Sequence, residues 1–280
     1  FIFGVRCMKC TVEHDGLTKS VIQTCMLHSI EQCKDAAIGN KARNILLVQN
    51  WGFRIPKSYC VAADIFKSLH LHRYNQHLEL GVEGGNEIET QVLETALPAE
   101  LLEKLAQLDN STRWAVRSSA LDEDGHSASF AGQYHSELQL SVDEIPAAIQ
   151  RCYASFFTEH VASYRAVNAV SSDKAWGMAV LVQEMVQPYC AGVMFTKSPT
   201  LANSLVVESV PGVADRLLNG RSEPDRYWIE RRGLRGSLGS RMSFWELGEI
   251  RRECHSPQFL DDVQFAALAK LGLKLEQRYG

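Results

Sequence analysis

The sequence lacks several features that mark specialised classes of protein. It has no window of the roughly 18 to 20 uncharged apolar residues that a membrane-spanning helix needs, and its opening FIFGV is too short for a signal-peptide core. It also lacks an excess of positive charge, because 33 Asp and Glu residues outnumber 29 Lys and Arg residues. Charge therefore gives no case for general binding to nucleic acid, and we expect a cytoplasmic globular protein without membrane or nucleic-acid partners.

Cysteine is too sparse for a disulfide scaffold, with 8 residues in 280, and most of these lie in apolar patterns, so we expect reduced thiols. Near the N-terminus, Cys7, Cys10, Cys25 and His28 have a spacing that could close a tetrahedral zinc site. No glycine follows the first pair to form a tight knuckle, which favours simple thiols over a metal site. The chain starts with Phe rather than Met, so we expect that the true N-terminus is not shown.

Apolar periodicity predicts an α+β fold in which a mostly helical part precedes a mixed part. We expect an extension of uncertain structure over 1–28, a mostly helical first lobe over 29–110 and a mixed second lobe over 111–280. Helices are predicted over 38–52, 63–78, 97–108, 141–168 and 261–280. Strands are predicted over 113–120, 133–140, 176–186, 190–196, 204–210 and 225–232. The acidic, glycine-bearing stretch 81–89 is predicted to be a loop.

Two basic residues occupy places where a phosphate-binding protein needs fixed positive charge. Arg117 lies near the end of the apolar strand AVRSSA, where its planar guanidinium could meet two phosphate oxygens. Lys41 lies at a predicted helix start in IGNKARN and could supply a point charge. The alternatives are a solvated helix lysine for Lys41 and a surface ion pair of Arg117 with Asp122 or Asp124. Without further information, the residue types favour these alternatives.

The stretch SASFAGQY, which follows that strand, has the composition of a loop that covers phosphates. Ser129 offers a hydroxyl, Gly132 an unhindered backbone and Gln133 an amide, so backbone N–H groups could approach phosphate oxygens closely. Such a loop would open for exchange of the ligand. The alternative is an ordinary β-turn with a bulge at Gly132.

Several motifs, taken in order, resemble the N-terminal ATP-binding domain of the phosphoenolpyruvate synthase and pyruvate phosphate dikinase family, an ATP-grasp fold with two lobes. They are Lys41 after IGN, AVRSSA, SASFAGQY, VLVQEMV, AGVMFT and VVESVPGVADRLLNG, and the resemblance covers roughly residues 29–280. Ser119 makes it closer to the phosphoenolpyruvate synthase and rifampin phosphotransferase branch, because a glycine usually stands there in the other branch. With this order of motifs, we expect Lys41 and Arg117 to be the catalytic cations.

The resemblance implies ATP as the ligand, Mg²⁺ bound with its phosphates, and further nucleotide contacts. At the exit of the strand AVLVQEMV these are Gln183, Glu184 and Met185, with Met185 contributing main chain to an adenine site. The alternative is an ordinary buried strand that turns at QPY. In VVESVPGVADRLLNG the implied contacts are Glu208 and Asp215.

The sequence departs from the family pattern at several points. Pro211 and Ala214 replace residues of the usual turn, which puts the placement of Asp215 in question, and Ser198 stands where the family commonly has an aspartate. The stretch that usually follows the final helix and ligates the catalytic metal is not seen after Gly280, so no metal ligand is assigned. We expect either a fragment of a longer enzyme or a shortened relative.

The function implied by the resemblance is that of an ATP-dependent phosphotransferase. It would pass a phosphoryl group from ATP to a histidine on a separate domain and then to pyruvate or another small acceptor. Catalysis would consist mostly of positioning and charge neutralisation, and this chain alone would be an incomplete, inactive fragment. A catalytically inactive nucleotide-binding or regulatory module is the alternative, and a third hypothesis is an interaction protein organised by the N-terminal zinc site.

Overall fold

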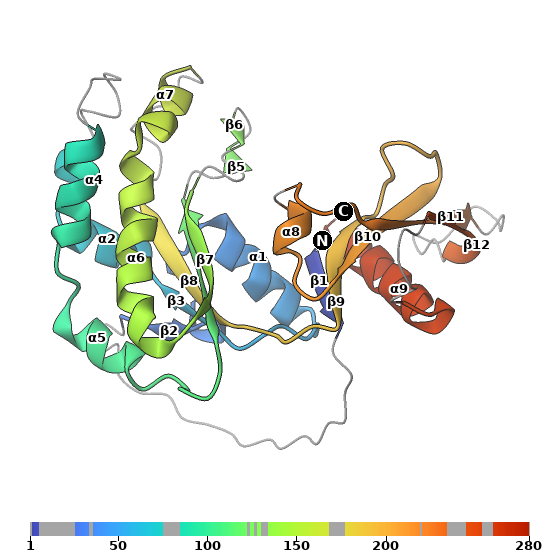
Figure 1. The fold of residues 1–280 in the computed structure, drawn as a ribbon, viewed down its shortest axis with the longest axis horizontal. Coiled ribbons are helices and arrows are strands. Elements are labelled where there is room, and N and C mark those ends of the chain that lie inside the picture. The colour runs from blue at the N-terminus through green and yellow to red at the C-terminus, as the bar shows by residue number, and fades with distance from the viewer. Residues whose placement is uncertain are drawn as a thin grey trace. The chain divides into compact units, whose positions relative to one another are not determined.

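The computed structural model shows a mixture of helices and strands, which confirms the expected α+β class. It describes residues 2–5, 26–33, 36–74, 85–121, 124–125, 128–129, 134–167, 177–218, 220–233, 245–253 and 260–279. Their contacts divide into two compact units, a larger one up to Met185 and a smaller one made of 2–5 and the residues from Val186 onward (Figure 1). Among the described residues, no helix has the length and apolarity that a membrane crossing requires.

The larger unit is built on an antiparallel sheet in which β8 is central. Its strands, in spatial order, are β2 (His28–Ser29), β3 (Ser58–Val61), β8 (Met178–Glu184), β4 (Trp114–Ala120) and β7 (Ser136–Leu140). The apolar run MAVLV of β8 is fully buried, because β3 and β4 pair with both of its edges and helices cover both faces of the sheet. This burial is what the uninterrupted apolar strand predicted.

Helices pack on both faces of this sheet (Figure 1). On one face, α1 (Gly39–Asn50) buries Ala42 and Leu46 against Cys60 of β3 and Leu181 of β8. The other face carries the larger core, which includes side chains of α2 (Ala63–Ser68), α4 (Gly85–Glu94), α5 (Ala99–Leu105), α6 (Ile145–Ala154) and α7 (Glu159–Val167). The strand β4 therefore presents alternate residues to α1 and to α6.

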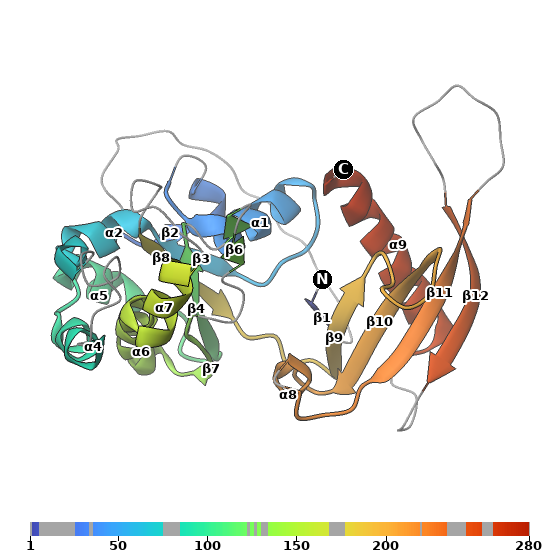
Figure 2. The ribbon, with the colours of Figure 1, turned by 90° about the horizontal axis from the view of Figure 1, so that it is seen from above.

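The smaller unit is a second antiparallel sheet, with α9 (Asp262–Tyr279) packed on one face (Figure 2). Its strands, in spatial order, are β1 (Ile2–Val5), β9 (Cys190–Phe195), β10 (Ser204–Pro211), β11 (Asp225–Gly233) and β12 (Trp245–Glu253). Tyr227 of β11 and Phe265 of α9 lie 4.1 Å apart between ring centroids, which ties helix to sheet. The short helix α8 (Asp215–Leu218) follows β10.

The single helix predicted over 141–168 is wrong. A 3-10 turn over Val142–Glu144 precedes α6, and a second one over Ser155–Phe157 separates α6 from α7. The hydroxyl of Thr158 accepts a hydrogen bond from the amide of Val161, so it caps a new helix start that the apolar periodicity does not reveal.

One further prediction differs from the structure, and one strand was missed. The loop predicted over 81–89 is wrong from Gly85 onward, because α4 begins there and buries Ile88 and Val92, which lie one turn apart. Strand β12 was not predicted at all. The contacts divide the chain after Met185, and helices from before residue 110 share one core with β4 and β8.

Candidate functional site

The start of α1 lies directly against the end of β4. The hydroxyl of Ser119 donates to the carbonyl of Ile38 at 2.7 Å and accepts from the amide of Ala42 at 3.1 Å. Gly39 has a φ of +67°, and a Cβ at this position would lie 2.1 Å from the carbonyl oxygen of Ser119. Only glycine allows this approach, so the first turn of the helix is held on the backbone of the strand.

This junction brings the two predicted cations to one face of the sheet. Arg117 precedes Ser119 by two residues, so strand alternation directs both side chains to the face that α1 covers. Lys41 is in the first turn of α1, next to Ala42, and both cations are half-buried. The structure therefore assembles the helix turn of Lys41 and the strand of Arg117 from segments that are far apart in the chain.

The predicted phosphate loop is described only in part. Ser129 belongs to the two-residue strand β6 (Ala128–Ser129), which pairs with β5 (Asp124–Gly125) as a short hairpin between β4 and β7. Gly132 and Gln133 lie outside the described residues. The role of this stretch as a phosphate-binding loop therefore stays a prediction.

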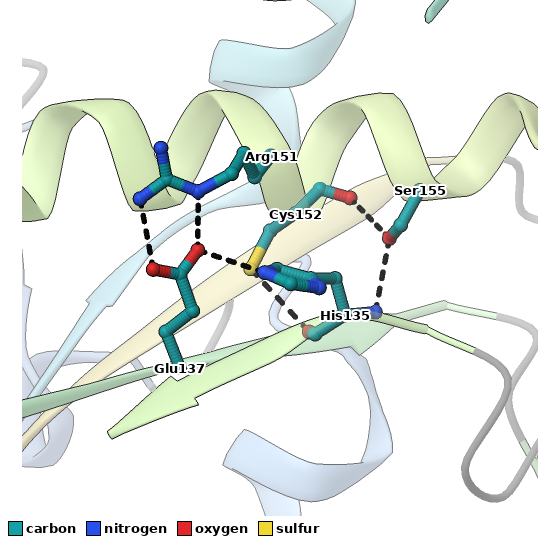
Figure 3. A network of polar contacts seen from close by, with 5 residues as sticks. All are labelled: His135, Glu137, Arg151, Cys152 and Ser155. Carbon is teal, nitrogen blue, oxygen red and sulfur yellow. Dashed lines mark hydrogen bonds and ion pairs between the residues drawn. The ribbon is translucent and has the colours of Figure 1, made fainter. Parts of the chain in front are cut away.

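The exit of this loop is anchored by a polar network on the opposite face of the sheet (Figure 3). The amide of His135 donates to the hydroxyl of Ser155 at 3.1 Å, and its carbonyl accepts from the amide of Ser118 at 3.3 Å and from the Cys152 thiol. The Ser155 hydroxyl in turn donates to the carbonyl of Cys152 at 2.7 Å. Both main-chain groups of the residue that follows the loop are thus fixed to α6 and β4.

A carboxylate completes this network. Glu137 accepts hydrogen bonds from Nε and Nη2 of Arg151, the latter at 2.8 Å, and its Oε1 lies 2.7 Å from Nε2 of His135. The hydrogen bond from Arg151 is the largest influence that lowers the pKa of Glu137, and the same bond raises the pKa of Arg151. The pair therefore stays ionised at neutral pH and ties β7 to α6.

The thiol of Cys152 is fully buried. Burial is the largest cause that raises its pKa to about 12, and Glu137 adds to the effect, whereas the charge of Lys41 acts in the opposite direction. The thiol is therefore neutral at physiological pH. Cys33, Cys60, Cys152 and Cys190 are all free thiols, as expected.

The predicted adenine residues lie where the chain leaves the larger unit. The side-chain amide of Gln183 donates to the hydroxyl of Ser58 at 2.9 Å. The backbone amide of Glu184 donates to the carbonyl of Lys57, and that of Met185 to the carbonyl of Arg113, both at 2.8 Å. These bonds fix the end of β8 between its two neighbouring strands.

The predicted acids lie in the smaller unit. Glu208 of β10 is half-buried, and its Oε1 accepts a 2.8 Å hydrogen bond from Nε of Arg226 on β11. Asp215 is exposed at the start of α8, after Gly212, whose φ is +69°. Pro211 still pairs with β9 and ends β10, so the departure from the family turn does not break the strand.

Ser198 takes a structural role in the turn between β9 and β10. Its hydroxyl accepts from the amides of Thr200 and Leu201 at 3.3 and 3.1 Å. An aspartate at this position would accept such bonds in the same way.

The structure shows partners of the predicted residues that sequence reasoning did not find. Arg226 could have been found, because the hairpin of β10 and β11 places it opposite Glu208. The pair of Glu137 and Arg151 joins two separate elements and leaves no local pattern in the sequence. Ser119 was noted only for its residue type, and its contacts with α1 come from the structure.

The described residues hold no group of three or more His, Cys, Asp or Glu side chains that could bind a metal ion. Of the four residues in the zinc hypothesis, only His28 is described, in β2, and Cys7, Cys10 and Cys25 lie outside the described residues. The zinc site therefore remains a prediction.

The structure thus places a helix start and a basic strand residue on one face of a sheet within a mixed α+β domain. Comparison with known protein families identifies the family to which the domain belongs. Residues 35–280 match the family described as pyruvate phosphate dikinase, AMP/ATP-binding domain, and the chain belongs to this family. The resemblance drawn from the motifs is thus confirmed.

Curated relatives agree with this assignment. The chain is 32% identical over 272 residues to the prodigiosin synthesizing transferase PigC of Serratia marcescens, covering 87% of the chain and 29% of that protein. It is 30% identical over 295 residues to a rifampicin phosphotransferase of Streptomyces sviceus, covering 91% and 33%. It is 34% identical over 178 residues to a probable phosphoenolpyruvate synthase of Methanothermobacter thermautotrophicus, covering 59% and 26%. The chain spans about a third or less of the length of these relatives.

Proposed function

We propose that this chain is the ATP-binding domain, with an ATP-grasp-like two-lobed fold, of a dikinase-like phosphotransferase. The observation that carries the proposal is the match of residues 35–280 to an AMP/ATP-binding domain family. The names of the relatives, rifampicin phosphotransferase and phosphoenolpyruvate synthase, favour an active phosphotransferase over an inactive regulatory module. The complete enzyme would transfer phosphoryl from ATP to a histidine on a separate domain and then to pyruvate or another small acceptor.

Lys41 and Arg117 are proposed to bind the phosphates of ATP. Both are carried by rigid elements that Ser119 joins, so little reorganisation is needed to place their charges. The guanidinium of Arg117 can bind two phosphate oxygens at once, and the ammonium of Lys41 acts as a point charge. Ser129, Gly132 and Gln133 would add contacts from the loop that follows β4.

The end of β8 is proposed to contact adenine. The amide N–H groups of Glu184 and Met185 are already donated within the unit. Glu184 and Met185 would therefore contact adenine through their main-chain carbonyl oxygens, which can accept a hydrogen bond from its exocyclic amino group. Gln183 would support this strand end through its bond to Ser58.

Mg²⁺ is proposed to enter with ATP, because this ion is commonly held by substrate phosphates and only one or two carboxylates. It would neutralise the charge that moves during phosphoryl transfer. Asp215, an exposed acid, is proposed as a contact of the nucleotide, and no metal ligand is assigned. The carboxylate of Glu208 is already bonded to Arg226, so it suits a hydroxyl donor such as the ribose better than a metal.

Calorimetric titration with ATP and with AMP in the presence of Mg²⁺ tests the phosphate site. Lys41→Ala and Arg117→Ala should each weaken ATP binding by roughly 10- to 100-fold, the value of a hydrogen bond to a charged group, and weaken AMP binding less. Arg43→Ala is the matched control on the same helix, and Arg113→Ala is the control next to β4, since both side chains are exposed. Equal losses in the control variants, or unchanged binding in the test variants, would contradict the proposal.

A further inference from the structure

The helix that carries Lys41 begins without a cap of its own. Ile38 occupies the N-cap position, and no side-chain hydrogen bond is made there, since an aliphatic side chain cannot accept one. The first turn of α1 also has no acidic residue to balance the partial positive charge of the helix start. Local sequence therefore gives this turn little stability, and its position depends on other contacts.

Ser119 supplies the missing contacts from a distant strand. Its hydroxyl binds the carbonyl of Ile38 and the amide of Ala42, the two main-chain groups that enclose the first turn. The side chain is fully buried, so water does not compete for these bonds. The turn between the two groups contains Lys41. A single hydroxyl thus fixes the turn from which Lys41 projects.

The same residue belongs to the strand of Arg117. Arg117 and Ser119 lie two residues apart on β4 and face the same side of the sheet. Movement of α1 relative to Ser119 would change the separation of Lys41 from Arg117. The contact of Gly39 with the carbonyl of Ser119 restricts sliding of the helix, and the hydroxyl restricts opening of its first turn.

We propose that Ser119 is a positioning residue for phosphate binding, which holds Lys41 in register with Arg117 without touching the ligand. This inference rests on the proposed function. It predicts that the hydroxyl of Ser119 contributes to ATP affinity only through Lys41. A residue that merely stabilised the fold would affect ATP affinity to the same degree whether or not Lys41 were present.

Ser118 provides a matched control. It is the neighbouring residue and equally buried, but it faces α6, and its hydroxyl is a buried group with no hydrogen-bond partner among the described residues. Ser118→Ala therefore removes the same atom from the same strand without removing a bond. Ser119→Ala removes both bonds to α1, and Ser119→Cys replaces the hydroxyl with a larger group that is a weaker donor.

Amide hydrogen exchange, measured without any nucleotide, tests whether the hydroxyl of Ser119 holds the first turn of α1. Ser119→Ala should speed exchange of the Ala42 amide by about tenfold, the value of one buried hydrogen bond, with Ser119→Cys intermediate and Ser118→Ala unchanged. Unchanged exchange at Ala42 in a folded Ser119→Ala protein would overturn the proposal. If Ser119→Ala does not fold, the Ser119→Cys variant gives the same test with a smaller effect.

A double-mutant cycle tests the functional part. In the parent background, Ser119→Ala should weaken ATP binding by about tenfold. In the Lys41→Ala background, the same substitution should leave ATP affinity nearly unchanged, because the group that it positions is absent. An equal loss in both backgrounds would overturn the positioning role and leave the proposed function intact. A parent that binds no ATP would instead contradict the proposed function, while the exchange data would still report whether Ser119 anchors α1.

Discussion

Glu208 and Arg226 lie directly opposite each other on β10 and β11, and Nε of Arg226 donates a 2.8 Å hydrogen bond to Oε1 of Glu208. This bond is the largest cause that raises the pKa of Arg226. The arginine therefore stays charged and orients the carboxylate on the face of the sheet that α9 does not cover. A carboxylate held in this way is a fixed acceptor rather than a mobile surface charge.

This arrangement predicts the effect of Glu208→Gln on nucleotide binding. The amide has nearly the same shape but loses the charge that strengthens hydrogen bonds from ligand hydroxyls, so ATP affinity should fall by about tenfold. Glu230→Gln, an exposed substitution on β11, should have no effect. Calorimetric titration of the two variants with ATP compares their affinities with that of the parent. Parent-like affinity of Glu208→Gln would remove Glu208 from the nucleotide contacts.

The two glycines at the ends of α1 should differ sharply in their tolerance of alanine. Gly39 and Gly52 both have positive φ, at +67° and +82°, but only Gly39 is enclosed by backbone atoms. Gly52→Ala should lower the free energy of unfolding by about 1 kcal/mol, because alanine disfavours the left-handed conformation. Gly39→Ala should lower the free energy of unfolding by about 3 kcal/mol or more, because the helix must also move away from β4. Urea denaturation measures both, and equal costs would contradict the close approach seen at Ser119.

Glu137 should stabilise the protein in a pH-dependent way. Arg151 lowers its pKa in the folded state below the usual value of 4.5, so the ionised pair contributes stability above that pH and loses it as the pH falls through the folded pKa. Glu137→Gln should cost about 1 kcal/mol at pH 7, the value of a partly exposed ion pair. The difference in unfolding free energy between parent and variant should narrow below pH 4.5. A difference that does not change with pH would exclude the charge as its cause.

The pair of Arg231 and Glu276 should be important for the docking of α9. Nη2 of Arg231 lies 2.6 Å from Oε2 of Glu276, and the two side chains are only 10% and 21% exposed. Glu276→Gln leaves a nearly buried guanidinium without its counter-charge, so the smaller unit should lose about 2 kcal/mol of stability. Glu230→Gln, on the same strand as Arg231 but exposed, is the control. A loss no larger than that of the control would show that α9 is held by its apolar face alone.

Much of the fold could be predicted because it depends on local patterns. The helices α1, α5 and α9 and the strands β4 and β8 follow from apolar spacing and from breakers such as Pro98 and Gly52. The edge strand β12 could not be predicted in this way. Its sequence, WELGEIRRE, is largely charged, which is typical of an edge that must not pair with another chain.

For the candidate site, the sequence offers residue types but not their arrangement. Lys41 and Arg117 could be proposed from charge and position, whereas the bond from Ser119 to Ile38 joins residues 81 positions apart. Periodicity reports which face of an element is apolar, but it does not report which distant group completes a helix start. For the same reason, the 3-10 turn at Ser155–Phe157 was missed, since the hydroxyl of Ser155 accepts a hydrogen bond from the amide of His135, which lies 20 residues earlier in the chain.

ATP is proposed to bind this chain through the cations on α1 and β4. The most direct measurement is a calorimetric titration of the chain with ATP and Mg²⁺, alongside folded Lys41→Ala and Arg117→Ala variants. We predict saturable binding to the parent at one site, and a loss of roughly 10-fold or more in each variant. Absence of binding to the folded parent, or equal binding to all three proteins, would contradict the account.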